Sequence, residues 1–137
     1  MVLWPEGGAL KKIAMPVKFF IGSPLGSGQQ YMPWIHLDDI CAMYLKAVED
    51  DQMVGAYNAI APEHITNSSL TKMIAHVLQR PLFLPNVPGS LLKILLGEMA
   101  VVVLEGSRAS CKKIKDTGFE FKFPTVKAAL KDLFQST

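Results

Sequence analysis

The glycine-rich stretch from Gly22 to Gly28, with the sequence GSPLGSG, is the first candidate for a ligand-binding loop. Glycines allow backbone N–H groups to approach a phosphate closely. A P-loop, however, ends in Gly-Lys-Ser/Thr, whereas Gly28 is followed by Gln29 and Gln30. A dinucleotide fingerprint also requires a helix directly after the glycines, and here an extended segment is expected. The pattern therefore favours a flexible surface loop, with closure over a substrate as the alternative.

His36 is a second residue with chemical potential, because it stands just before Asp38 and Asp39. A histidine in this position can act as a general acid or contact a substrate. It can equally be a structural imidazole that forms a hydrogen bond near the start of a helix, and the spacing alone favours that role. Three residues so close in the chain do not easily converge on one ion, so we predict no metal site.

Arg108 is the third candidate, since a guanidinium after Gly106-Ser107 and near a helix boundary can bind a phosphate or a carboxylate. Without further context, a solvated surface arginine is the favoured interpretation. The other residue types suggest no catalytic group. The glutamates show no pairing for two-carboxylate chemistry, and no serine lies in a Gly-x-Ser-x-Gly turn. We assign no catalytic residue within the chain.

The composition indicates an apolar chain, with 50% hydrophobic and 19% charged residues. The charged share is below the roughly 25% typical of soluble domains. Either this is a tightly packed α/β domain, or its apolar faces normally cover something absent from the chain; we favour the second. A net charge of +2 gives no argument for a nucleic-acid partner. The two cysteines lack metal or CxxC spacing and are expected to be free thiols.

No signal-peptide pattern is recognised at Met1, and the most apolar run, residues 91–104, is interrupted by Lys93, Gly97 and Glu98. We therefore expect a soluble, cytoplasmic protein with no membrane partner.

Hydrophobic periodicity predicts helices joined by a few short strands. The first predicted helix runs from Ala9 to Met15 and is stopped by Pro16. The second is capped by Asp38 and reaches Glu49, and the third is capped by Thr66 or Asn67 and broken at Arg80. Three more are predicted: one from Pro88 past Gly97 to Leu104, one capped by Ser110 and ended by Gly118, and one from Val126 to Phe134. The predicted strands are residues 1–4 and Gly55 to Ala61. Tyr31 to Leu37 is predicted to be an edge strand or an extended segment, and residues 119–123 a short strand or an extended arm. These strands are too few and short to complete a sheet, so something else should supply the rest.

The order of several motifs resembles the epimerase-like branch of the extended short-chain dehydrogenases/reductases, some of which carry a cell-division-inhibitor label. The resemblance covers essentially the whole chain, and its most specific part runs from the glycine-rich loop to the segment PWIHLDDI. The motifs are residues 7–12, 22–30, 33–40, 57–62, 66–67, 95–99 and 118–121.

The resemblance implies an α/β fold: the helix-rich carboxy-terminal part of a Rossmann-type extended short-chain dehydrogenase. Residues 1–80 would form its substrate-side lobe, and residues 81–137 a small helical carboxy-terminal domain. By similarity, the substrate-binding residues would be Gln30, Trp34, His36 and Arg108. The cofactor would be NADP (or NAD), bound mainly by an amino-terminal Rossmann half. That half carries the glycine-rich dinucleotide turn and a Tyr-x-x-x-Lys pair, and this sequence has neither.

Two functional hypotheses follow. The first is the substrate-binding portion of an NAD(P)-dependent sugar-nucleotide epimerase-like oxidoreductase, not a complete catalyst alone. Its partners would be a small-molecule substrate such as a nucleotide sugar and the Rossmann half. The alternative is a stand-alone binding module or half of a split protein, linked to cell division. Uncovered apolar surface also predicts self-association.

Overall fold

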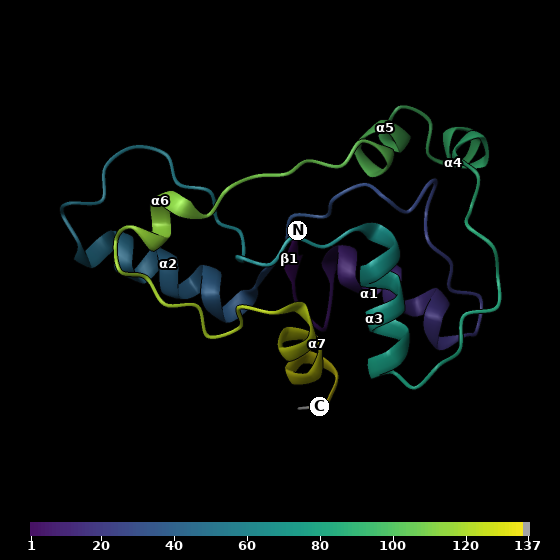
Figure 1. Ribbon diagram of the computed structural model, residues 1–137, viewed down its shortest axis with the longest axis horizontal. Coiled ribbons are helices and arrows are strands. Elements are labelled where there is room, and N and C mark those ends of the chain that lie inside the picture. The colour runs from purple at the N-terminus through teal and green to yellow at the C-terminus, as the bar shows by residue number, and fades with distance from the viewer. Residues whose placement is uncertain (136–137) are drawn as a thin grey trace.

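The computed structural model describes residues 1–135 of the chain and shows short helices around a minimal sheet (Figure 1). In chain order the elements are β1 (Val2–Leu3), α1 (Gly8–Lys18), β2 (Ile35–His36), α2 (Leu37–Glu49), α3 (Asn67–Val77), α4 (Gly89–Leu96), α5 (Met99–Leu104), α6 (Lys112–Lys115) and α7 (Val126–Gln135).

The two strands pair in parallel, with Val2 opposite Ile35 and Leu3 opposite His36. Parallel strands require a crossover connection, and α1 lies within it. Strand β1 contacts α1, α2 and α7 and so stands at the centre of the molecule. This arrangement confirms the prediction of a helix-rich α/β fold with a few short strands.

The larger hydrophobic core lies where α1, α3 and α7 meet β1 (Figure 1). Each helix contributes an apolar stripe with the spacing expected of an amphipathic helix. The stripes of α3 and α7 pack against each other, and α3 also packs against α1. Fully buried members of this core include Leu3, Leu10, Trp34, Leu70, Ile74 and Leu130.

A second, smaller core joins α2 to α6 on the other side of β1. It contains Ile35, Met43 and Ile114, against which Phe119 and Phe121 pack. Helices α4 and α5 pack against each other and lie apart from both cores in Figure 1.

The ends of the first two helices differ from the prediction. Helix α1 does not stop at Pro16 but includes it and continues to Lys18. Pro16 lacks only its own N–H, and the following amides of Phe19 and Ile21 donate to its carbonyl, so the last turn still closes. Helix α2 is capped by His36 rather than by Asp38, because the Asp38 amide donates to the imidazole Nδ1 at 3.1 Å.

The predicted helix through Gly97 is divided into α4 and α5. Gly97 has a φ of +58°, the left-handed conformation that suits glycine and terminates α4. Helix α3, capped by Thr66, and helix α7 are confirmed with small shifts of their ends.

The predicted strands are shorter than expected or absent in the described residues. The segment from Tyr31 to Leu37 reduces to β2 and one isolated bridge between Tyr31 and Thr66. Pro33 lies between them and has no N–H for a ladder. The segments 55–61 and 119–123 are extended but form no strand, although the Ala61 amide donates to the Trp34 carbonyl at 2.7 Å.

Candidate substrate-side site

The glycine-rich loop is fastened to the amino-terminal end of α3. Asn67, only 1% exposed, accepts a hydrogen bond from the Leu25 amide on its Oδ1 at 2.7 Å, and its own amide donates to the Gln30 carbonyl at 2.9 Å. Gln30 is also buried, and its Nε2 donates to the Leu25 carbonyl at 2.9 Å. The loop that the sequence suggested to be flexible is therefore held by one asparagine at its middle, Leu25, and just after its end, at Gln30.

Three amides of the loop are occupied within the chain. Leu25 donates to Asn67, Gly26 to the Val87 carbonyl at 2.8 Å, and Gly28 to the Leu25 carbonyl at 3.0 Å. A phosphate cradle needs such N–H groups pointing outward. The amides of Leu25, Gly26 and Gly28 are therefore not available to a pyrophosphate.

Glycine is required at Gly28 because two conditions coincide there. Its φ is +72°, and a Cβ would lie 2.9 Å from the Cβ of Ser68. The Ser68 amide donates to the Gly28 carbonyl at 2.8 Å, so the loop crosses close to the first turn of α3. Substitution here would force the loop away from the helix.

Arg108 lies over the ring of Tyr31, three residues after the end of the loop. Its guanidinium carbon is 5.4 Å from the centre of the Tyr31 ring, a cation–π distance. Gly106 permits this approach, since a Cβ would lie 2.4 Å from the Tyr31 nitrogen and 2.5 Å from its oxygen. Both Arg108 and Tyr31 remain exposed. The segment 106–108 therefore presents a positive charge directly above residues 30 and 31.

Trp34 is buried in the larger core and is 1% exposed. Its indole Nε1 donates to the Glu63 carbonyl at 2.9 Å, so its single polar group is satisfied inside the protein. The Glu63 carboxylate in turn accepts from the Val126 amide at the start of α7. Trp34 thus connects β2 to α7 and does not reach the surface near Arg108.

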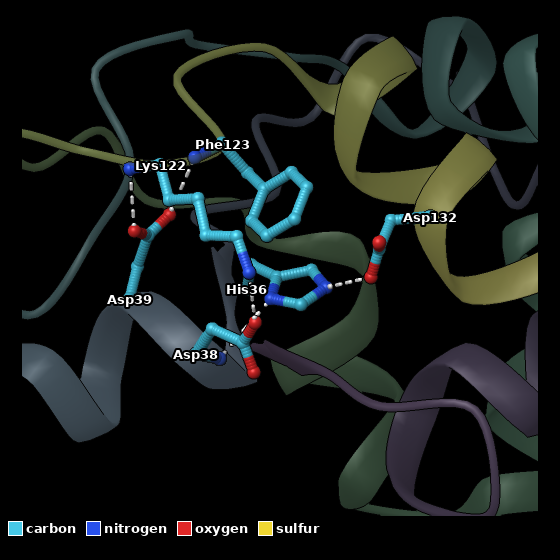
Figure 2. A network of polar contacts seen from close by, with 6 residues as sticks. All are labelled: His36, Asp38, Asp39, Lys122, Phe123 and Asp132. Atoms are coloured by element: carbon cyan, nitrogen blue, oxygen red, sulfur yellow. Dashed lines mark hydrogen bonds and ion pairs between the residues drawn. The ribbon is translucent and has the colours of Figure 1, made fainter. Parts of the chain in front are cut away.

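His36 is also buried, at 2% exposure, and is the centre of the network in Figure 2. Its Nδ1 accepts from the Asp38 amide, so the ring proton of this tautomer lies on Nε2. Nε2 is 3.3 Å from Oδ2 of Asp132 on α7. It makes no aligned hydrogen bond, so the attraction is mainly electrostatic. The ring also packs at 4.0 Å from the Phe123 ring.

Asp39 joins the start of α2 to the segment before α7 (Figure 2). It is 1% exposed, and its two carboxylate oxygens accept from the amides of Lys122, at 2.7 Å, and Phe123, at 3.0 Å. A buried carboxylate is tolerated because both oxygens accept from backbone N–H groups and it lies in the first turn of a helix. Asp39 is therefore a structural residue.

Asp38 and Lys122 form an exposed ion pair beside Asp39, with Nζ and Oδ2 2.8 Å apart. The hydrogen bond from Lys122 lowers the pKa of the Asp38 carboxyl below its usual value. The same bond raises the pKa of the Lys122 ammonium above its usual value. Both shifts favour the charged forms of the pair.

The four residues predicted to bind substrate separate into two groups. Gln30 and Arg108 lie together next to the loop, whereas Trp34 is buried beside Glu63 and His36 is buried between the start of α2 and α7. Sequence reasoning missed the anchoring roles of Asn67, Asp39 and Asp132. The first is a residue beside a recognised cap, but the other two have partners far away in the sequence, and no local pattern indicates such pairs.

Within the part of the chain that the structure describes, no group of three histidine, cysteine or acidic side chains could hold a metal ion. Cys41 and Cys111 are free thiols. Among the same residues, no helix is both long and apolar enough to cross a membrane.

The fold defines the class of protein. The model superposes with a TM-score of 0.92 on the crystal structure of human epimerase family protein SDR39U1 with NADPH, at 31% identity, covering 99% of this chain and 46% of that one. A UDP-glucose 4-epimerase from Thermotoga maritima, solved with UDP-glucose, gives a TM-score of 0.66 at 19% identity, covering 98% of this chain and 43% of that one. The second likeness shows the fold alone. The chain has the fold of the carboxy-terminal region of Rossmann-type extended short-chain dehydrogenase epimerases.

Sequence comparison narrows the class to a family. The chain is 42% identical to an SDR39U1 homologue of Arabidopsis thaliana, described as chloroplastic, covering 98% of this chain and 39% of the relative. It is 35% identical to mouse epimerase family protein SDR39U1, covering 97% of this chain and 45% of the relative. Residues 87–133 match a domain of unknown function (DUF1731). The chain is therefore homologous to the carboxy-terminal part of epimerase family SDR39U1 proteins.

The chain spans less than half the length of these relatives. One relative is described as chloroplastic. The cytoplasmic location of this chain therefore stays a prediction.

Proposed function

We propose that this chain is the substrate-side portion of an NAD(P)-dependent sugar-nucleotide epimerase-like oxidoreductase and is not a complete catalyst alone. The main observation that supports this proposal is structural similarity to a protein solved with NADPH. The TM-score is 0.92, and the match covers 99% of this chain and 46% of that protein. A chain that reproduces one part of such a protein so closely is expected to perform that part's role.

Arg108 is the group that would hold the substrate. An exposed guanidinium over the Tyr31 ring can pair with a phosphate through two parallel hydrogen bonds. This feature suits a nucleotide sugar, which offers a diphosphate. Gln30 shapes the adjoining loop through its bond to the Leu25 carbonyl. Trp34 and His36 are buried and would not contact a substrate held by Arg108.

The cofactor, NADP or NAD, would be bound mainly by an amino-terminal Rossmann half. The occupied loop amides argue that this chain supplies no pyrophosphate cradle. We also propose two regions, residues 1–80 as the substrate-side lobe and residues 81–137 as the small helical domain.

The outer face of α2 is a surface that the Rossmann half would cover. Tyr44, Leu45 and Val48 are 69%, 59% and 81% exposed, and they repeat at helical spacing. An apolar stripe of this kind favours association when left uncovered. We therefore expect the isolated chain to self-associate.

Titration of UDP-glucose into the full chain, followed by calorimetry, tests the site. We expect weak binding that Arg108→Ala lowers roughly tenfold, the usual effect of losing one charge-assisted contact of this kind. Arg108→Lys should recover only part of it, because an ammonium lacks the planar fork.

Lys115→Ala is the matched control, since Lys115 is an exposed cation without an ion pair within 4 Å among the described residues. Equal loss in Lys115→Ala and Arg108→Ala, or no binding by the unchanged chain, would remove the substrate assignment. A chain that binds no nucleotide sugar would instead favour the alternative of a stand-alone interaction module.

A further inference from the structure

The exposed sides of α3 and α7 form a groove away from the loop and Arg108. It consists of two open hollows of about 410 Å³ each, which share His76. We call this the α3–α7 groove. Five basic residues line it: Lys72, His76 and Arg80 from α3 and its end, and Lys127 and Lys131 from α7.

The basic residues form two facing rows. Lys72, His76 and Arg80 follow one another at intervals of four, as do Lys127 and Lys131. Lys72 and His76 share a face of α3, and Lys127 and Lys131 share a face of α7, whereas Arg80 follows the end of α3 at Val77. All five side chains are exposed, and among the described residues none has a carboxylate within 4 Å. Arg80 lies over the Phe20 ring, with its guanidinium carbon 4.7 Å from the ring centre, whereas no ring contact holds Lys72, Lys127 or Lys131 among the described residues.

The net charge of the groove lining is also opposite in sign to that of the rest of the chain. The whole sequence has 14 basic and 12 acidic residues. Four of the basic ones, Lys72, Arg80, Lys127 and Lys131, line the groove, which leaves 10 basic against 12 acidic elsewhere, a balance of −2. No acidic residue lines either hollow. Positive charge is therefore concentrated at this one surface.

The lining indicates the kind of partner. Met73, Ala75 and Val77 contribute apolar surface between the basic rows. The lining holds no Phe, Tyr or Trp on which nucleic-acid bases could stack. The charged groups of the lining lie at the tips of exposed side chains and are spread along the groove. They therefore suit several separated negative charges better than one small ligand. From Lys127 to Gln135 α7 rises about 12 Å, the length of two helical turns or about four extended residues.

We propose that the α3–α7 groove binds an acidic, partly apolar protein segment, two helical turns or a few extended residues long. Its carboxylates pair with the two basic rows, and its apolar side chains contact the floor between them. One hollow lies at the carboxy-terminal end of α3 and the other reaches back to Ser69 in its first turn, but neither is lined by the glycine-rich loop or by Arg108.

Fluorescence anisotropy on the full chain tests this proposal with a labelled peptide in which Glu and Leu alternate. We expect binding that weakens as salt is raised, and that weakens by at least roughly tenfold in the triple variant Lys72→Glu, Lys127→Glu, Lys131→Glu. The same peptide with Gln in place of Glu should not bind. A milder Lys72→Gln, Lys127→Gln, Lys131→Gln variant gives the same answer should charge reversal impair folding, as judged by circular dichroism.

The matched control reverses three other exposed lysines, Lys12→Glu, Lys93→Glu and Lys115→Glu, so that the net charge changes equally. Retained binding in this control supports the groove. Equal loss in both triple variants shows that net charge alone attracts the peptide and overturns the proposal. So does binding of the Gln peptide, or tighter groove-dependent binding of inorganic triphosphate, single-stranded RNA or phosphatidylserine vesicles.

Discussion

The Nε2 atom of His36 lies 3.3 Å from the Asp132 carboxylate, and this approach joins the start of α2 to α7 across the molecule (Figure 2). The same imidazole caps α2 through Nδ1. One buried ring therefore fixes both where a helix begins and how two distant parts of the chain meet. This is a structural role.

The two roles of His36 can be separated by substitution. His36→Asn should keep the cap, because asparagine is among the best capping residues, yet lose ring packing and the contact with Asp132. We expect a loss of about 2 kcal/mol in unfolding free energy by urea denaturation. Asp132→Ala alone should cost under about 1 kcal/mol, since its side chain is 40% exposed. The double variant should show a coupling of roughly 0.5–1 kcal/mol; fully additive losses would mean that the contact contributes nothing.

Asp39 and Asp38 offer adjacent, chemically matched positions. Asp39→Asn replaces one acceptor oxygen by a donor that faces a backbone N–H, so we expect a loss of about 2–3 kcal/mol in unfolding free energy. Asp38→Asn removes only the exposed pair with Lys122 and should cost under about 1 kcal/mol. Comparison of the two urea midpoints tests the difference. Equal midpoints would show that Asp39 is not the anchor of residues 122 and 123.

The ion pair of Asp38 and Lys122 predicts a limited pH dependence. The folded-state pKa of Asp38 is lowered from 3.8, so its contribution is present above that value and is lost as pH falls through the folded pKa. The pKa of Lys122 is raised from 10.5, so its contribution is present below that value and is lost as pH rises through the folded pKa. Thermal melts of Lys122→Ala should therefore differ from those of the unchanged chain between about pH 4 and 10. The two should converge in more acidic and more alkaline solution, and a constant difference would refute this assignment.

Gly106 should matter to ligand binding although its own side chain is a hydrogen atom. Gly106→Ala places a Cβ 2.4 Å from the Tyr31 nitrogen, so the segment carrying Arg108 must move. We expect UDP-glucose binding to fall about as far as in Arg108→Ala. Gly118→Ala is the control, because its φ is +80° but a Cβ would meet nothing within 4 Å. It should cost roughly 1 kcal/mol of stability and leave binding unchanged; binding lost in both variants would point to general destabilisation.

Patterns of neighbouring residues predicted the helices, whose formation depends mainly on residues close in the sequence. Helices α3 and α7 carry a clear apolar stripe, and α3 begins at the predicted cap, Thr66. The alternation in residues 119–123 was wrong as a strand, because Phe119 and Phe121 pack into the core around α2 without a pairing partner. Strand formation depends on a neighbouring strand, which no local pattern can supply.

The candidate site shows the same division. Gln30 and Arg108 came from the family resemblance and prove to be neighbours through the close approach of Gly106 to Tyr31. Trp34 and His36 came from the same motif but are buried, since a motif states which residues occur and not which side of the chain they face. The partners Asn67, Asp39 and Asp132 depend on contacts between distant segments.

The most direct test of the central claim is fluorescence titration of NADPH, first into this chain alone and then into a mixture with the separately produced remaining portion of human SDR39U1. We predict no saturable binding by this chain alone up to millimolar NADPH, and binding in the mixture that exceeds the sum of the two parts. Micromolar binding of NADPH by this chain alone would contradict it, because a complete cofactor site would then lie within these 137 residues.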